Sequence, residues 1–177
     1  MFAHLRLLTT LGLLSAALPA SAQWTNGQNA QFVIGQPDFD TWGLATSQNQ
    51  MGLAYGIAID TTHSKVYVCD QIAHRVLRYS YPIIANQPNA EIVFGQANFT
   101  DSTSNAGGLS GSSLQNPSEL EVDATGRLWI SDMSNNRVLA FDNAHLIASN
   151  KPTADKVLGQ PTMSSVCLLY TSDAADE

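Results

Sequence analysis

The chain has 177 residues, of which 44% are hydrophobic and 13% are charged, and its formal net charge is −7 at pH 7. Asp and Glu outnumber Lys and Arg by 15 to 8, and the basic residues form no cluster along the chain. Proteins that bind nucleic acid carry a basic patch or stripe, so this composition argues against a nucleic-acid partner.

The first 22 residues have the pattern of a secretory signal peptide. Arg6 precedes an apolar stretch at residues 7–20, and Ala-Ser-Ala at residues 20–22 fits a cleavage site. The alternative is a membrane anchor, but the stretch is short for a spanning helix, which needs about 20 apolar residues. We therefore expect a mature chain that begins at Gln23, a secreted, periplasmic or cell-envelope location, and no membrane span after cleavage.

An eight-residue phrase then occurs three times, as FVIGQPDF at residues 32–39, IVFGQANF at 92–99 and KVLGQPTM at 156–163. Its glycines are Gly35, Gly95 and Gly159, so the spacing is 60 and then 64 residues. Self-similarity at such a period is typical of solenoids, propellers and repeat arrays. We interpret these glycines as structural repeat positions.

A second repeat lies between the phrases, where residues 56–80 align with residues 119–142. Short apolar runs separated by turn residues predict strands at residues 57–59, 66–69, 76–79 and 91–95. The second copy predicts strands at residues 120–122, 128–131, 138–141 and 156–159. Four strands in each unit, with no long amphipathic helix after residue 22, predict an all-β fold built from four-stranded antiparallel propeller blades.

These units resemble the NHL repeat family. The first copy carries AYGIAID, VYVCD and AHRV, and the second carries NPSELEVD, LWISD and NNRV. The resemblance implies repeat units at about residues 32–94 and 95–158, with the next unit starting at residue 159. Residues 23–166 would then be a partial propeller arc of about two to three blades. An arc leaves blade faces and edges open, so we expect it to self-associate.

Residues 167–177 depart from the repeat pattern directly after the third phrase. Their sequence, CLLYTSDAADE, resembles the conceptual translation of a transposase-type sequencing adapter. We therefore expect the natural reading frame to continue beyond Val166; the alternative is a genuine polar tail. Residues 23–166 alone carry seven Lys and Arg against twelve Asp and Glu, a net charge of −5.

Two kinds of charged residue recur at equivalent positions in the two units. In each unit an Asp ends the second predicted strand and an Arg follows five residues later, which suits a bridge across a hairpin rather than catalysis. A further Asp in each unit precedes a turn, where its carboxylate can accept hydrogen bonds from turn amides. The equivalent pairs are Asp70 with Asp132, Arg75 with Arg137, and Asp60 with Asp123.

Glu119 and Glu121 stand where the first unit has Gly56 and Ala58. Two residues apart on a strand, their side chains point to the same face. The resemblance places this strand innermost, so the pair could line the central channel and hold calcium. The two carboxylates could equally serve acid–base chemistry, with one pKa raised by the other. The remaining alternative is a solvated strand face.

The cysteines and histidines suggest no further chemistry at this stage. Cys69 aligns with a serine in the second unit, which favours a small buried residue over a reactive thiol or a disulfide with Cys167. His74 aligns with Asn136 and is expected to be a turn residue rather than a metal ligand, because it has no partners at ligand spacing; His63 falls in a turn and His145 in a connecting segment.

These observations leave two classes of function. The favoured one is a secreted or cell-envelope scaffold that binds a protein or carbohydrate ligand, with no catalytic residues and no evident cofactor. The alternative implied by the resemblance is a propeller enzyme of lactonase or lyase type, with a metal site in the central channel completed by several blades.

Overall fold

The computed structural model describes residues 26–166, and the predicted signal peptide and the adapter-like residues 167–177 lie outside these described residues. The chain divides into two units, Met1–Ala30 and Gln31–Glu177. The described part of the first unit, residues 26–30, contains a turn at Asn26 and Gly27. All the strands of the described residues lie in the second unit.

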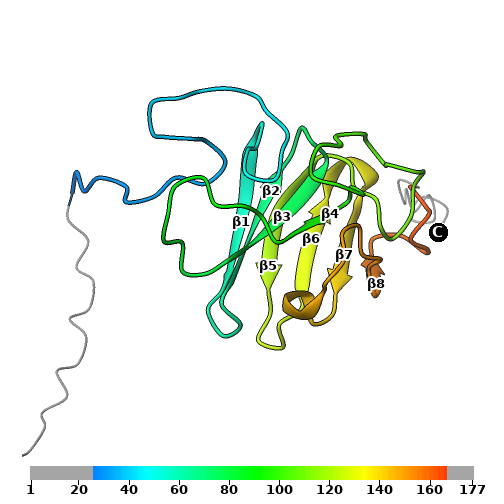
Figure 1. Ribbon diagram of the computed structural model, residues 1–177. Helices are drawn as coiled ribbons and strands as arrows, with labels where there is room; N and C mark the ends of the chain where they lie inside the picture. The colour runs from blue at the N-terminus through cyan, green and yellow to red at the C-terminus, as the bar shows by residue number, and fades with distance from the viewer. Residues whose placement is uncertain (1–25, 167–177) are drawn as a thin grey trace, which may run out of the picture. The chain divides into compact units, whose positions relative to one another are not determined.

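The second unit is built from two four-stranded antiparallel sheets (Figure 1). The first blade consists of β1 (Ala54–Asp60), β2 (Lys65–Asp70), β3 (Arg75–Ser80) and β4 (Ile92–Phe94), paired in that order. The second blade consists of β5 (Pro117–Val122), β6 (Leu128–Asp132), β7 (Arg137–Phe141) and β8 (Lys156–Leu158). Two 3₁₀ helices flank β7, η1 (Met133–Asn135) and η2 (Ala144–Leu146).

The prediction of an all-β fold of four-stranded antiparallel blades is confirmed, because every predicted strand is present in the predicted order. The two blades face each other, and β1 and β5 are the strands through which they approach most closely. Consecutive antiparallel strands within each sheet, with sheets arranged side by side, are the architecture of a β-propeller. The described chain is therefore a two-blade arc of a propeller.

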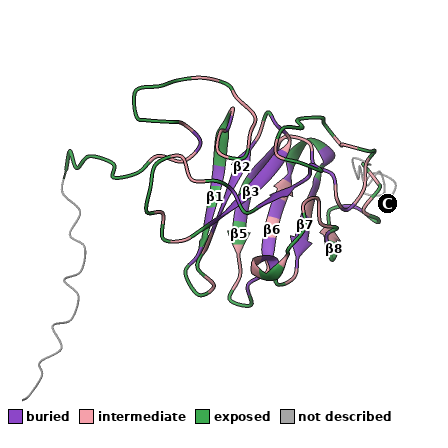
Figure 2. Cartoon of the chain, in the orientation of Figure 1, coloured by how far each residue is buried: buried purple, intermediate pink, exposed green. Residues whose placement is uncertain are grey.

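Burial follows the period of two that a strand imposes (Figure 2). In β1, Gly56, Ala58 and Asp60 are buried, whereas Tyr55 and Ile57 on the other face are exposed. The middle strands β2 and β3 are buried on both faces, because one face packs on the second blade and the other is covered by loops.

The core between the blades holds aromatic and aliphatic side chains from both sheets. Phe94 of β4 meets Phe141 of β7 edge to face, with ring centroids 5.1 Å apart. At the closest approach, a Cβ on Gly56 would lie 2.1 Å from the carbonyl oxygen of Ser118. Only glycine fits that position, so the packing of the two blades depends on it.

A second core lies on the far face of the first blade, where loop residues take the place of a sheet. Ile34, Ile83 and Phe99 pack against its buried members, which are Met51, Val66, Val68, Leu77, Tyr79, Ala90 and Val93. Within residues 26–166, no helix has the length and hydropathy that a membrane crossing requires.

The repeated phrase forms the same glycine turn in all three copies. Gly35, Gly95 and Gly159 have φ of +86°, +88° and +83°, a left-handed conformation that favours glycine. The second and third copies follow β4 and β8, whereas residues 32–39 contain no strand. In the second copy, the buried Gln96 donates hydrogen bonds to the carbonyls of Ala73, His74 and Thr103. The phrase is thus a turn whose glutamine fastens neighbouring backbone.

Candidate functional site

The Asp–Arg pair of the first blade is completely buried between β2 and β3. Asp70 and Arg75 lie directly opposite each other in the strand register, and Arg75 Nε donates to Asp70 Oδ2 at 2.9 Å. Asp70 Oδ1 accepts the amides of Gly52 and Leu53, each at 3.1 Å. Arg75 also donates to the carbonyl of Gln50 at 2.8 Å, so the pair fastens the preceding loop to the hairpin.

The second blade repeats this arrangement. Arg137 Nε donates to Asp132 Oδ2 at 2.7 Å, and Asp132 Oδ1 accepts the amide of Gln115 at 2.7 Å. Arg137 further donates to the carbonyls of Ser110, Ser113 and Met163. Both side chains are fully buried and engaged with backbone groups, which excludes contact with a substrate. In both blades the pair is a structural cross-link.

Asp60 and Asp123 each organise a turn. Asp123 accepts hydrogen bonds from the Thr125 hydroxyl at 2.5 Å and the Trp129 indole at 3.1 Å, and from the amides of Thr125 and Arg127. These donors hold the pKa of the Asp123 carboxyl well below its usual range. Asp60 accepts the amide of His63 at 2.9 Å and approaches its Nδ1 at 2.8 Å.

Glu119 and Glu121 are both exposed, on the face of β5 that points away from the first blade. Leu120 between them packs into the core shared with the first blade, so the alternation of the strand turns the glutamates outward. They line a groove of about 340 Å³ together with Trp129, Ser131 and Val138. Neither makes an ion pair with another described residue.

Glu119 and Glu121 are equivalent to Gly56 and Ala58, which lie on the face of the first blade that packs against β5. The glutamates therefore lie on the corresponding face of the second blade. Calcium takes about six to eight oxygen ligands, so a calcium site here would need oxygens in addition to the two carboxylates. That the pair lines a central channel stays a prediction.

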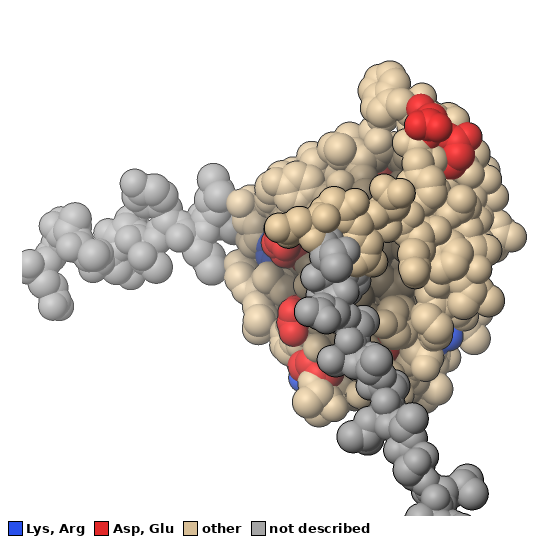
Figure 3. Space-filling view, turned by 90° about the vertical axis from the view of Figure 1, so that its left-hand side faces the viewer, with Lys and Arg blue, Asp and Glu red and all other residues tan. Residues whose placement is uncertain are grey.

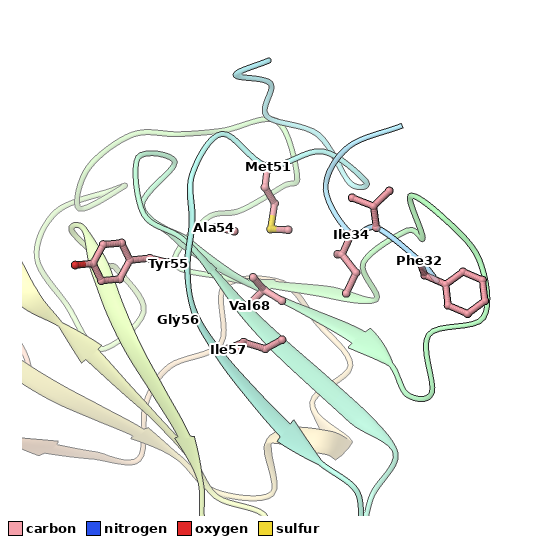
Figure 4. Close-up of a pocket in the computed structure, with 9 residues that line it drawn as sticks. Phe32, Ile34, Met51, Ala54, Tyr55, Gly56, Ile57 and Val68 are labelled. Carbon is pink, nitrogen blue, oxygen red and sulfur yellow. The ribbon is translucent and has the colours of Figure 1, made fainter. Parts of the chain in front are cut away.

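An apolar groove lies on the outward face of the first blade (Figure 4). We call it the β1 groove; its volume is about 390 Å³, and its lining residues are Phe32, Val33, Ile34, Met51, Ala54, Tyr55, Gly56, Ile57 and Val68. Ile34, Met51, Val68 and Ile57 converge on it from separate segments of the chain. Tyr55 and Ile57 are 60% and 58% exposed. The view from the β1 side in Figure 3 shows a mainly uncharged surface, with acidic side chains in a few separate clusters.

The β1 groove was not predicted, although the sequence carries one signal of it. Tyr55, Ile57 and Ile59 alternate with the small or polar residues Gly56, Ala58 and Asp60. In a half-buried strand the larger apolar residues normally face the core. Here they face outward, because the inward face must be small enough for β5 to approach.

Cys69 is fully buried in the core between the blades, and burial raises the pKa of its thiol to about 12. A thiol that stays protonated at neutral pH is a poor nucleophile.

The structure brings two of the histidines together beside an aspartate, a proximity that was not expected from the sequence. Asp60, His63 and His145 each offer a ligand atom within 4.8 Å of the others. His63 follows β1 and His145 lies in η2, 82 residues later, so only the packing of the two blades brings them together. No local spacing in the sequence could have revealed this cluster.

No protein-family model matches the chain, and no curated protein matches it. Among solved structures it is similar to a luciferin-regenerating enzyme, with 18% identity and a TM-score of 0.42 over 65% of this chain and 32% of that one. It is also similar to a chain of a nidogen/laminin complex, with 16% identity and a TM-score of 0.40 over 65% of this chain and 33% of that one. The chain spans about a third of the length of these proteins. Similarities at this level leave the function open, and the propeller fold rests on the strand order and pairing described above.

Proposed function

We propose that the chain is an exported propeller of the NHL type that acts as a scaffold and binds a protein ligand through the β1 groove. The observation that carries this proposal is the groove itself, an exposed apolar surface built on a strand face. Contiguous apolar surface on a soluble protein typically marks an interaction site. Aromatic and aliphatic residues such as Tyr55 and Ile57 are the kind that anchor protein partners.

The chemistry of the groove favours a protein ligand over a carbohydrate. Its described lining residues are apolar, apart from the hydroxyl of Tyr55 and backbone groups. The hydroxyl groups of a carbohydrate would lose hydrogen bonds to water there without gaining enough partners. Apolar side chains of a peptide have no such hydrogen bonds to lose, and their burial in the groove is favourable.

A binding role also agrees with the burial and pairing of the repeated Asp and Arg residues. The two buried Asp–Arg pairs are engaged with each other and with backbone groups, so they have no capacity left for acid–base chemistry. The alternative, a propeller enzyme with a metal site, has one specific observation in its favour. Glu119 and Glu121 stand side by side on one strand face, in a groove beside Trp129.

The binding proposal is tested by selecting peptides from a phage-displayed random library on the immobilised full chain. We expect apolar peptides that lose binding to Ile57→Lys, because a lysine in the groove opposes apolar contact. The matched control is Ile84→Lys, since Ile84 is 80% exposed and lies outside the groove. Peptides that bind Ile57→Lys as well as the parent chain would contradict a groove-based scaffold, and so would a glycan array that yields ligands instead.

The enzyme alternative has its own test. The double variant Glu119→Gln with Glu121→Gln should lower the calcium-dependent thermal stability of the protein if the pair holds the ion. Equal unfolding temperatures with and without calcium, in both the parent and the variant, would remove this alternative.

Export is tested separately by expressing the full chain with its leader and sequencing the N-terminus of the released protein. The proposal expects the released protein to begin at Gln23, after the Ala-Ser-Ala sequence. Retention of residues 1–22 on a membrane-bound product would contradict export.

A further inference from the structure

A cluster of two imidazoles and one carboxylate lies at the junction of the two blades, away from both grooves. Asp60 ends β1, His63 lies in the turn between β1 and β2, and His145 lies in η2 of the second blade. Their candidate ligand atoms all lie within 4.8 Å of one another. These side chains hold no role in the proposed binding of a protein ligand.

Asp60 orients the first imidazole. Its Oδ1 accepts the amide of His63 at 2.9 Å, and its Oδ2 lies 2.8 Å from His63 Nδ1. Asp60 is itself buried, at 5% exposure. This separation lets one ion take both Asp60 Oδ2 and His63 Nδ1 as ligands, with the ring proton carried on Nε2.

The residue before the second imidazole, Ala144, is bonded to both blades. Arg78 of β3 donates to the carbonyl of Ala144 at 2.6 Å, and the amide of Ala144 donates to the carbonyl of Gly126. The His145 ring stacks on His63, with centroids 3.6 Å apart and 13° between the ring planes. Its Nδ1 is buried and has no hydrogen-bond partner among the described residues. Buried polar atoms normally have one, so this nitrogen needs an explanation.

Gly126 lies directly against both rings, with no space for a side chain. A Cβ at this position would lie 2.8 Å from His63 Cε1 and 3.2 Å from His145 Nδ1. Gly126 has a φ of +77°, so the turn and the close approach of the imidazoles both favour glycine here.

We propose that Asp60, His63 and His145 form a binding site for a divalent transition metal, with Zn²⁺ as the best fit. Two imidazole nitrogens and one carboxylate oxygen are a ligand set that Zn²⁺ accepts, with water in the fourth position. Calcium and magnesium prefer oxygen ligands, so they suit this set less well. An ion here would bridge the first and second blades.

The stacked rings set a condition on binding. Two imidazoles that are nearly parallel cannot both direct their in-plane lone pairs at one ion. Coordination therefore requires the His145 side chain to rotate out of the stack while Asp60 keeps His63 in place.

Two basic side chains near the cluster, Lys65 and Arg78, share one carboxylate, which offsets part of their positive charge. Glu91 pairs with Lys65 at 2.8 Å and with Arg78 at 2.9 Å. Their charges therefore oppose an incoming cation less than free ammonium and guanidinium groups would.

Calorimetric titration of the full chain with Zn²⁺ at neutral pH tests this site. We expect one ion per chain, with the Kd raised at least about tenfold by His145→Ala and by His63→Thr. The control is His74→Asn, which removes a histidine outside the cluster and installs the residue that the second blade has at the equivalent place, Asn136. Co²⁺ provides a second readout, because four-coordinate cobalt absorbs in the visible range.

Each outcome decides the proposal. Loss of the Zn²⁺ heat and the Co²⁺ absorption in both cluster variants, with both kept in His74→Asn, supports it. Unchanged binding in either cluster variant overturns it, as does loss in all three variants. Far-UV circular dichroism without metal checks the fold, and if His145→Ala does not fold, the His63→Thr variant decides alone.

Discussion

At the residue scale, buried ion pairs hold loops to hairpins in both blades. The side chains of Asp132 and Arg137 are fully buried, and each also bonds to backbone groups, Asp132 to the amide of Gln115 and Arg137 to the carbonyl of Ser110. Removing one member of a buried pair leaves an uncompensated charge, whereas replacing both by apolar residues often costs little.

Asp132→Asn should therefore lower the free energy of unfolding by about 3–5 kcal/mol. Urea denaturation of the full chain measures this change. The comparison variant is Asp132→Leu with Arg137→Met, which removes both charges. Its loss of unfolding free energy, divided by the two charges removed, should be smaller than the loss in Asp132→Asn. A loss below about 1 kcal/mol in Asp132→Asn would show that the pair contributes as little as a surface ion pair.

A second residue-scale prediction concerns pH. Burial lowers the pKa of His74 from its usual 6.5, although Asp132 and Asp70 act in the opposite direction. The unfolded chain then binds the proton more readily than the folded chain, so stability is full above about pH 6.5 and falls as the pH drops through that value. His74 Nδ1 also accepts the amide of Asn116 at 3.1 Å, a bond that protonation would break.

We expect His74→Asn to flatten the decline in the free energy of unfolding between neutral pH and about pH 5. Denaturant titrations of the parent and the variant at both pH values give the two slopes. Equal slopes would mean that other groups control the acid sensitivity.

At the scale of elements, the docking of β1 against β5 depends on one missing side chain. A Cβ on Gly56 would lie 2.1 Å from the carbonyl oxygen of Ser118 and 3.1 Å from Glu119 Cα. Both obstacles are backbone atoms, so the strands themselves would have to separate. The alternation of β1 thus serves the contact between blades rather than the burial of large side chains.

Gly56→Ala should accordingly lower the free energy of unfolding by about 1–3 kcal/mol, the usual cost of overpacking. The matched control is Gly43→Ala, because a Cβ on Gly43 meets nothing within 4 Å. Thermal unfolding of the two variants provides the comparison. Equal unfolding temperatures would show that the blades can separate at no cost.

At the scale of the whole molecule, the two outward faces differ in character. The face at β1 is apolar, whereas the face at β5 carries Glu119 and Glu121. A second copy that docked its β1 face on this β5 face would bury two carboxylates against apolar side chains, which costs free energy. The glutamates therefore oppose head-to-tail stacking of copies.

The double variant Glu119→Gly with Glu121→Ala gives β5 the residues that the first blade has at Gly56 and Ala58. We expect it to form head-to-tail oligomers at lower concentration than the parent chain, because it removes both charges and allows close strand approach. Sedimentation velocity measures the mass distribution. Glu119→Gln with Glu121→Gln separates the effects, since it removes only the charges. An unchanged distribution in both variants would contradict a role of the glutamates in limiting association.

The sequence by itself determined the blades. The alternation of apolar residues, the turn residues and the repeated Gly-Gln phrase predicted eight strands, all of which are present. Asp70 and Arg75 could be paired from the sequence because a short hairpin sets them opposite each other. Such features depend on residues that are neighbours along the chain or across one turn, so a periodic pattern is sufficient to reveal them.

Only the tertiary structure decided which strand face meets the other blade. It turned Tyr55 and Ile57 outward into a groove, it placed Glu119 and Glu121 on an open face, and it joined His63 to His145. The two-residue period of a strand shows that alternate residues share a face, but it does not show which of the two faces is covered. That choice depends on the close approach of β1 to β5, a contact between residues far apart in the chain that no local pattern records.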